Sequence, residues 1–280
     1  YSRGYDLKSS VIGSNNTGMA NSTSGLTDAY RRTNLSYLAR LNYVFMNRYM
    51  LTASIRRDGS NRLFYPDNTW DNFPAIALAW NIKEAPFMQK FAFIDQFKLR
   101  FGYGETGNHN TGSDYATFDK IESRLNAYNQ VAYELVYGNA NIQWERTKQY
   151  NGGLDMGFLN NRLTASIDVY DKQSEGVFTN VNTPLITGTS SLKGNGATLQ
   201  NSGVEVTIGA DPIVGKTFSW NTNLTMSHNK TIVKDLPDGA EWMDLSGNYE
   251  NNYFRLIKGE KTATMWGYVN EGVWTTEEVA

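Results

Sequence analysis

The chain has 280 residues, 40% of them hydrophobic and 13% aromatic, with a formal net charge of −2 and no cysteine. A charge this close to neutral argues against a nucleic-acid groove, which needs a basic stripe. The lack of cysteine excludes a disulfide scaffold, a thiolate metal site and a cysteine nucleophile. Mean hydropathy is −0.50. The sequence contains no apolar run of about 18 residues, so it does not predict a transmembrane helix.

The first clear strand signal is a hairpin. The first thirty residues are rich in Ser, Asn, Thr and Gly without periodicity, which predicts a loop. Apolar residues then occupy every second position from Leu35 to Phe45, and again from Tyr49 to Ile55. This period of two is typical of a strand with one apolar face. The short link Met46-Asn47 predicts a tight turn between the two strands.

Six further strands follow in chain order. The same alternation predicts strands over about 73–82, 97–104, 144–158, 162–172, 204–208 and 218–226. The clearest is 162–172, where Leu163, Ala165, Ile167 and Val169 alternate with polar residues after the turn 159–161. From about Asn229 onward the pattern fades into loop.

The connections alternate in length. They are short near 46, 83, 159 and 211, and long over 57–72, 105–142, 172–198 and after 229. Outer-membrane barrels have short periplasmic turns and long outside loops, whereas a soluble sandwich has no reason to sort its loops in this way. We therefore predict an all-β fold, an antiparallel transmembrane β-barrel, with a soluble sandwich as the alternative. The 17 tyrosines and seven tryptophans fit either membrane girdles or a carbohydrate-binding surface.

Several short strings, in order and at consistent spacing, carry a resemblance to one family. They are Arg57-Asp58-Gly59-Ser60, Phe73-Pro74, Ala79-Trp80, the run from Leu99 to Asn108, Gln143-Trp144-Glu145, Gly153-Leu154-Asp155, Asn161-Arg162-Leu163 and Asn201 to Glu205. From about Asn34 to Val273 the chain resembles the barrel region of the SusC/RagA family of TonB-dependent outer-membrane transporters.

The resemblance implies a large, 22-stranded, plugged barrel in the outer membrane of a Gram-negative bacterium, in contact with lipid and lipopolysaccharide. It implies active import of oligosaccharides or peptides, energy from TonB, and a SusD-like surface lipoprotein as a lid. The chain opens on Tyr1 and closes on loop-like sequence. We therefore expect residues 1–280 to be one part of the barrel domain, without the plug, the TonB-contacting segment or the last strands.

Charged residues on the polar faces of the strands would line the lumen of such a barrel. These are Arg56, Lys98, Arg100, Asp155, Asp168 and Glu205. They form either a charge lattice against plug and water or a set of contacts along the import path. A second set, aromatic residues in predicted loops, could stack on sugar rings, contact the lid or pack against neighbouring loops. This set is Trp70, Tyr65, Tyr133, Tyr137, Phe178 and Trp242.

Enzyme chemistry has little support. The two histidines, His109 and His228, lie far apart, and no carboxylates show the spacing of a calcium loop. The run from Gly102 to Gly107 matches G-x-G-x-x-G, but no helix follows it. We expect no catalytic residue, metal, cofactor or nucleic-acid partner. The rival functions are a surface adhesin or carbohydrate-binding protein, and a passive porin.

Overall fold

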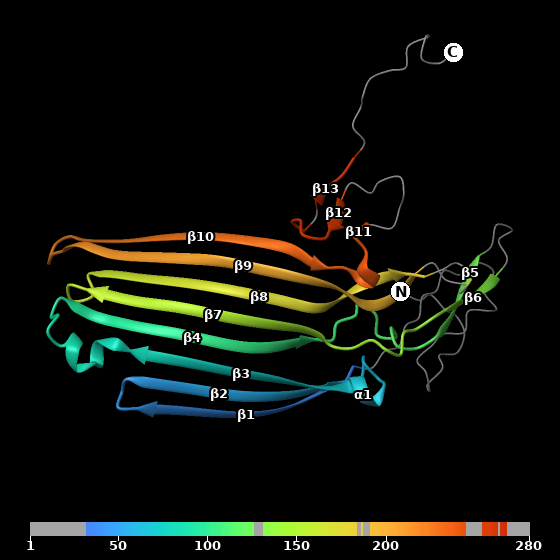
Figure 1. Cartoon of the computed structure of the whole chain (residues 1–280), viewed down its shortest axis with the longest axis horizontal. Helices are drawn as coiled ribbons and strands as arrows, with labels where there is room; N and C mark the ends of the chain where they lie inside the picture. Colours follow the sequence, from blue (N-terminus) through green and yellow to red (C-terminus); the bar gives the residue numbers. More distant parts are fainter. Residues whose placement is uncertain are drawn as a thin grey trace, which may run out of the picture.

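Antiparallel strands dominate the computed structural model, which describes residues 32–125, 131–183, 186, 191–244, 254–262 and 264–267. Eight of them form one sheet in the order β1-β2-β3-β4-β7-β8-β9-β10 (Figure 1). Their bounds are β1 (Asn34–Phe45), β2 (Tyr49–Ser60), β3 (Trp70–Asn81), β4 (Ile94–Asn108), β7 (Glu145–Phe158), β8 (Leu163–Asn182), β9 (Ser191–Val214) and β10 (Ser219–Asp235).

The other elements are short and lie in the connections. One small sheet pairs β5 (Lys120–Leu125) with β6 (Val131–Val136), and another joins β11 (Trp242–Asp244), β12 (Phe254–Ile257) and β13 (Thr264–Met265). The helical pieces are α1 (Pro66–Thr69), η1 (Ile82–Glu84), η2 (Pro86–Met88) and η4 (Pro237–Gly239). No helix among the described residues is both long enough and apolar enough to cross a membrane.

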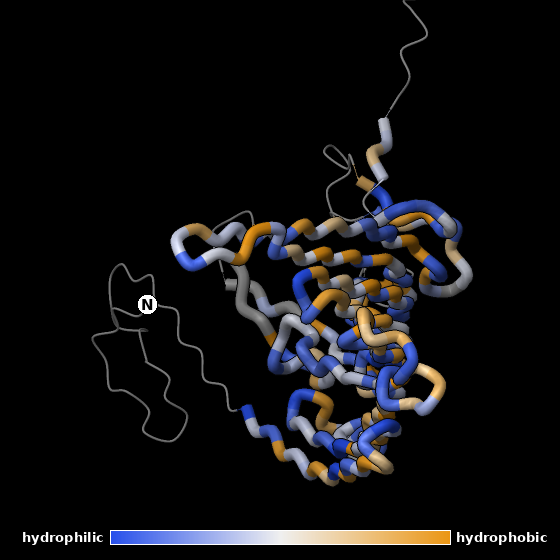
Figure 2. Tube along the Cα trace, turned by 90° about the vertical axis from the view of Figure 1, so that its left-hand side faces the viewer, coloured by the Kyte–Doolittle hydropathy of each residue, from blue (hydrophilic) through white to orange (hydrophobic). Residues whose placement is uncertain are grey.

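The eight-stranded sheet is a single curved layer. Seen from the end that carries the tight turns, it forms an open arc (Figure 2). The fold is the wall of an antiparallel transmembrane β-barrel, left open because these strands are part of a larger barrel. Adjacent strands bond to each other along the arc, which satisfies the backbone within the wall as a membrane requires.

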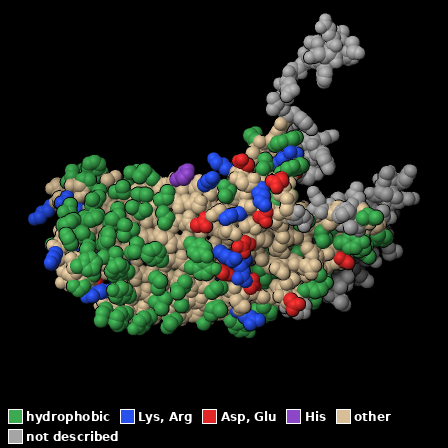
Figure 3. Space-filling model, viewed as in Figure 1, with side chains coloured by type: hydrophobic (Ala, Val, Ile, Leu, Met, Phe, Trp, Pro, Cys, Tyr) green, Lys and Arg blue, Asp and Glu red, His purple; other side chains and the backbone are tan. Residues whose placement is uncertain are grey.

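The strand register separates apolar from charged side chains. One row across the sheet pairs Leu99 with Leu154, Leu154 with Ile167, and Ile167 with Val206. Successive residues of a strand point to opposite faces. The next row therefore faces the other way, and it contains Arg100 and Asp168. We call the two sides the apolar face, which forms the outside of the arc, and the inner face. Figure 3 shows the apolar face, densely covered with hydrophobic side chains over much of its length.

The apolar band is short and lies in the half of the sheet nearer the tight turns. On β8 it runs from Leu163 to Val169 and gives way to Asp171 at the next position on that face. At about 3.3 Å per residue this is roughly 20–25 Å measured along the strand, somewhat less than the length of the roughly 9–11 residues of a tilted spanning strand. The sheet continues well beyond it, since β9 alone has 24 residues where about 10 suffice to span.

Aromatic rings mark both edges of the apolar band. Near the tight turns, Tyr43, Phe45, Tyr49 and Trp80 form a stacked ladder with ring centroids 6.2–6.5 Å apart. At the opposite edge, Tyr37 stacks on Trp70 and Tyr103 contacts Tyr150, with centroids 5.9 and 4.8 Å apart. Rings with polar tips favour the boundary between lipid and water. The two bands therefore outline the predicted girdles.

The tight turns are confirmed where the sequence predicted them. Met46 and Asn47 have φ of 53° and 54°, and Leu159, Asn160 and Asn161 have φ of 57–60°. Two successive left-handed residues give a primed turn, which matches the twist of the strands that it joins. Asn is one of the residues that tolerate this backbone conformation, which explains its place in both turns.

Both buried hydrophobic clusters lie at the loop end of the sheet, opposite the tight turns, whereas Ile82, Ala85 and Met88 are buried around η1 and η2 at the other end. One cluster joins Leu63, Phe73, Ala116, Ile142 and Trp144, and a second joins Ala197, Val233, Leu236 and Leu256. A single-layer wall cannot bury side chains along its middle, because lipid and the barrel interior occupy its two sides. These clusters instead fix the connections 61–69, 109–118 and 137–144 onto the strand ends.

The predicted long loops were partly wrong. The range 172–198 is mostly strand, since β8 continues to Asn182 and β9 starts at Ser191. The range 105–142 contains the β5–β6 pair, and β10 continues to Asp235. Two register shifts between Ser174 and Phe178 interrupt the alternation in β8. Beyond the membrane both faces meet water, so no alternation is required and the sequence signal disappears.

The two faces give a direct test at adjacent residues. Arginine at a mid-membrane, lipid-facing position costs about 2–4 kcal/mol. Ile167→Arg should therefore impair assembly of the full-length barrel far more than Asp168→Asn, which changes the inner face. Heat-resistant migration in detergent measures the folded fraction. Equal losses for the two variants would contradict the assignment of faces.

Candidate functional site

An ion-pair network on the inner face is centred on Arg100. Its Nε and Nη2 donate to the two oxygens of Asp155, each at 2.8 Å, and Nη2 lies 2.9 Å from Oδ1 of Asp168. The Ser166 hydroxyl donates to both carboxylates at 3.1 Å. A bidentate arginine–carboxylate pair fixes the planes of both groups. The network thus ties β4, β7 and β8 together across the sheet.

Gly153 makes this network possible. It stands between Arg100 and Asp168 in the register of β4, β7 and β8. A Cβ at this position would lie 2.5 Å from Oδ1 of Asp168 and 2.7 Å from Cζ of Arg100. Any other residue would therefore occupy the space that the guanidinium crosses. Glycine is therefore needed at position 153 to leave room for the ion pairs, and not only to suit the backbone conformation.

The predicted inner-face residues divide into two groups. Lys98 pairs with Asp155 and Glu205 with Asp168 in the strand register, so both adjoin the Arg100 network. Arg56 lies apart, near the loop end, where its Nε is 2.7 Å from Asp58 and its guanidinium lies 5.8 Å from the centre of the Phe73 ring. The sequence therefore named three members of the network, Arg100, Asp155 and Asp168, together with two neighbours of it and the separate Arg56, but it missed Ser166 and Gly153.

A shallow trough of small side chains lies between these charged groups. It has a volume of about 320 Å³ and is lined on β2, β3 and β4 by residues such as Thr52, Ser54, Ala75, Ala77, Gly102 and Gly104. Most of these side chains end at or close to Cβ, so the inner wall is unobstructed here. Arg40 and Asn151 also line the trough. Another part of the protein could therefore pack closely against the wall at this trough.

At the loop end, Asp114 anchors the segment that follows β4. Nε of Arg32 donates to it at 2.8 Å, and Nε of Arg62 donates to it at 2.8 Å. The hydrogen bond from Arg32, followed by that from Arg62, lowers the pKa of Asp114 below its usual value. Arg62 also donates to Asn110 at 2.6 Å. The segment is thus held against the end of β2.

Four of the six predicted loop aromatics lie in strands; Trp242, in β11, is described below with its neighbours, and the other three lie at the loop end of the structure. Trp70 opens β3 on the apolar face, where it stacks on Tyr37, so its assignment to a loop was wrong. Phe178 lies in β8 and packs against the buried cluster around Trp144, so it was also wrongly assigned to a loop. Tyr133, on β6, is 77% exposed. The structure does not gather these three into one surface.

The remaining candidates have separate surroundings. Tyr65 precedes α1 and contacts Phe64, while Tyr137 follows β6 and is exposed. Trp242 lies on β11, with the Arg255 guanidinium 3.8 Å from its ring centre. The same guanidinium lies 3.6 Å from the ring centre of Trp266. The sequence missed this Trp–Arg–Trp stack, because Trp242 and Arg255 lie in two short strands, Trp266 lies just after a third, and none of them has a periodic pattern.

The family is decided by comparison with known proteins. The model of the family described as TonB dependent receptor-like, beta-barrel matches residues 1–275. The chain belongs to the TonB-dependent receptor family. Its match covers the barrel part of that family, in agreement with the single-layer wall and its two faces.

Relatives place this TonB-dependent receptor barrel in the SusC/RagA group. The chain is 39% identical to the TonB-dependent receptor SusC of Bacteroides thetaiotaomicron, over 90% of this chain and 26% of that protein. It is 37% identical to the TonB-dependent receptor P39 of Formosa agariphila, over 90% of this chain and 24% of that protein. The chain thus spans about a quarter of the length of these curated relatives.

Solved structures agree with the fold. The structure titled as the RagAB peptide transporter matches with a TM-score of 0.73 at 24% identity, over 84% of this chain and 25% of that chain. The RagAB peptide importer in the 'closed-closed' state matches with a TM-score of 0.71 at 25% identity, over 81% of this chain and 24% of that chain. The predicted transmembrane barrel and the predicted family are both confirmed.

The Arg100 network generates a stability prediction. Arg100→Ala leaves Asp155 and Asp168 without their shared cation, which we expect to cost about 1–3 kcal/mol of unfolding free energy. Arg40→Ala is the matched control, because Arg40 has no ion-pair partner in the described ranges. The midpoint of heat-induced unfolding in detergent measures the effect. Adding Asp155→Asn and Asp168→Asn to Arg100→Ala should restore part of the loss.

If Arg100→Ala and Arg40→Ala lower the midpoint equally, the network does not stabilise the wall.

Proposed function

We propose that this chain is part of the wall of an outer-membrane active transporter that imports bulky nutrients, either oligosaccharides or peptides, with energy supplied through TonB. One observation carries the proposal. In this chain of the TonB-dependent receptor family, four adjoining strands place a row of apolar side chains on one face and a row of ion-paired side chains on the other. A soluble adhesin would have to cover the apolar row with a second layer. Within the described residues no second layer covers it.

The inner face suits a barrel that holds a plug domain. A passive porin needs an open, water-filled lumen, whereas a plugged receptor needs a wall that accepts packed protein. The trough between Ser54 and Gly104 offers close approach, and the Arg100 network beside it offers fixed charges. We propose that Arg56, Lys98, Arg100, Asp155, Asp168 and Glu205 face the lumen, where they contact plug and water.

The loop end is the place where a lid and a ligand would bind. Tyr133 and Tyr137 are exposed there, and Trp242 keeps half of its surface exposed beside Arg255. Exposed aromatic rings can stack on sugar rings or anchor a protein partner. The names of the similar proteins support a two-component assembly, since RagAB is a pair and is described as a peptide transporter. We propose a SusD-like lipoprotein as the partner at this end.

Sidedness follows from the same arrangement. We propose that the tight turns lie in the periplasm and the loop end outside the cell, as in outer-membrane barrels generally. Ile186 is 95% exposed at the loop end, and Lys216 is exposed in the turn between β9 and β10. In a full-length protein without other cysteines, Ile186→Cys should react with an impermeant maleimide on whole cells, and Lys216→Cys should react only after the outer membrane is permeabilised. The opposite labelling pattern would invert the topology.

Energy coupling separates the transporter from the porin. Cells that grow on one complex glycan or peptide source should lose that growth when the gene for the full-length protein is deleted, and also when TonB is deleted. Growth on the monosaccharide or the free amino acids, which pass through porins, is the control. The full-length protein should also copurify with a surface lipoprotein.

Uptake that persists without TonB would reject active transport and favour a porin. A full-length protein that is soluble without detergent would reject both readings and favour an adhesin.

A further inference from the structure

A charged belt lies on the apolar face, directly beyond the outer aromatic band. Glu105 and Lys148 are partners in the register two positions beyond Tyr103 and Tyr150, so they share the face of those rings. Arg146 bridges Glu105 and Asp71, with N–O distances of 2.5 and 2.6 Å, and Lys148 pairs with Glu175 at 2.7 Å. Figure 3 shows Lys or Arg and Asp or Glu side chains grouped beside the hydrophobic band. With the loop end outside the cell, as proposed above, this height corresponds to the headgroups of the outer leaflet.

A polar hollow opens in this belt. Its volume is about 390 Å³, and it is lined by Asp67, Asn68, Trp70, Asp71, Gln143, Trp144, Arg146, Glu175, Gly176 and Asn195. Asn195 shapes one wall by bonding the backbone of Gln143 and Gly176. The indole N–H of Trp144 is buried and has no acceptor among the described residues.

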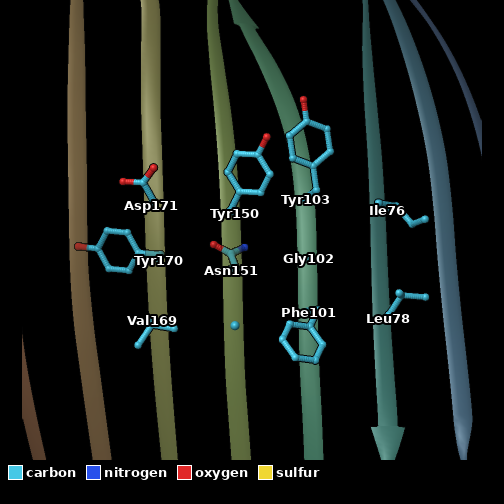
Figure 4. Close-up of a pocket in the computed structure, with 11 residues that line it drawn as sticks. Ile76, Leu78, Phe101, Gly102, Tyr103, Tyr150, Asn151, Val169, Tyr170 and Asp171 are labelled. Carbon is cyan, nitrogen blue, oxygen red and sulfur yellow. The ribbon is translucent and has the colours of Figure 1, made fainter. Parts of the chain in front are cut away.

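An apolar hollow lies on the same face, on the membrane side of the tyrosines. Its volume is about 590 Å³, and Figure 4 shows Phe101, Leu78 and Val169 around it, with Tyr103, Tyr150 and Asp171 along one rim. Gly152 forms its floor between Phe101 and Val169 in the register. A Cβ at Gly152 would lie 3.3 Å from Cγ2 of Val169. The hollow exists because this lipid-facing position carries no side chain.

The two hollows lie in line along the same strands, and we call the pair the amphipathic track. Both are lined by β3, β7 and β8, and Gly152 lies six residues from Arg146 on β7, roughly 20 Å along the strand. Tyr103 and Tyr150 stand between them with their polar tips toward the belt. A molecule that fills both must have an acyl chain at one end and a polar head at the other.

We propose that this track binds a glycolipid of the outer leaflet, with an acyl chain against Gly152 and a sugar of the headgroup in the polar hollow. Trp70 offers an aromatic face, the carboxylates and Asn68 accept hydrogen bonds from hydroxyls, and Arg146 donates. The carboxylates of Asp67, Asp71, Glu105 and Glu175 outnumber the cations Arg146 and Lys148. The head is therefore recognised through its hydroxyls and not through a phosphate.

The proposal rests on the transmembrane fold and on the proposed sidedness, and it is independent of the transported substrate. The test uses full-length protein in mild detergent, stripped of lipid, with the shift of the heat-unfolding midpoint as the measurement. Rough lipopolysaccharide should raise the midpoint, and the same lipopolysaccharide after phosphatase treatment should raise it equally. Phosphatidylethanolamine and the lipid-free core oligosaccharide should each give a much smaller shift, because each fills only one hollow.

Variants test the two hollows separately. Gly152→Leu fills the apolar hollow and should weaken the apparent affinity for rough lipopolysaccharide at least fivefold, and Val169→Phe should do the same from the neighbouring strand. Ala165→Leu adds the same bulk to the apolar face outside the hollow and should bind like the unmodified protein. Asp67→Ala should weaken binding of the glycolipid without changing the response to phosphatidylethanolamine.

Equal shifts with phosphatidylethanolamine, or unchanged affinity in both Gly152→Leu and Val169→Phe, would overturn the proposal. Loss of the response after phosphatase treatment would overturn recognition through hydroxyls.

Discussion

The structure depends on one constraint: each backbone N–H and C=O of a membrane wall must be bonded to the neighbouring strand. In hydrocarbon an unsatisfied group costs several kilocalories per mole, so strands must pair along their whole membrane length and in one register. The pairing of Leu99, Leu154, Ile167 and Val206 in one row is the direct consequence. A slip of one residue would turn this row inward and place Arg100 and Asp168 in lipid. The hydrophobic pattern and the charge pattern thus enforce the same register.

The inner face adds a second level of order to that register. Partly exposed ion pairs contribute little singly, but Arg100 joins two carboxylates and a hydroxyl from neighbouring strands in one network. The network needs an empty position at Gly153, so the backbone pairing, the glycine and the partly exposed charges depend on one another. Gly152, the next residue, faces lipid and leaves a hollow there. Two adjacent glycines therefore shape opposite sides of the same wall.

The wall extends far past the membrane and changes character as it does so. Within the band, lipid demands apolar side chains on one face. Beyond it, Arg146, Lys148 and their carboxylate partners occupy that face, and buried clusters around Trp144 and Val233 pack the connections. The loop end is thus an ordered, packed structure carried on strands that continue beyond the apolar band.

The sequence by itself determined the strands inside the membrane, their two faces, the tight turns and the family. A period of two is a local signal, and lipid makes it strict from Leu163 to Val169 or from Leu99 to Tyr103. It also named Arg100, Asp155 and Asp168 as members of one face. Only the tertiary structure decided that they bond to each other. The pairing register of strands more than fifty residues apart cannot be inferred from the pattern within one strand. It also decided where β8 and β9 end, since water on both faces and the bulges after Ser174 remove the alternation. The Trp242–Arg255–Trp266 stack and the hollow at Gly152 arise from side chains that meet only after folding.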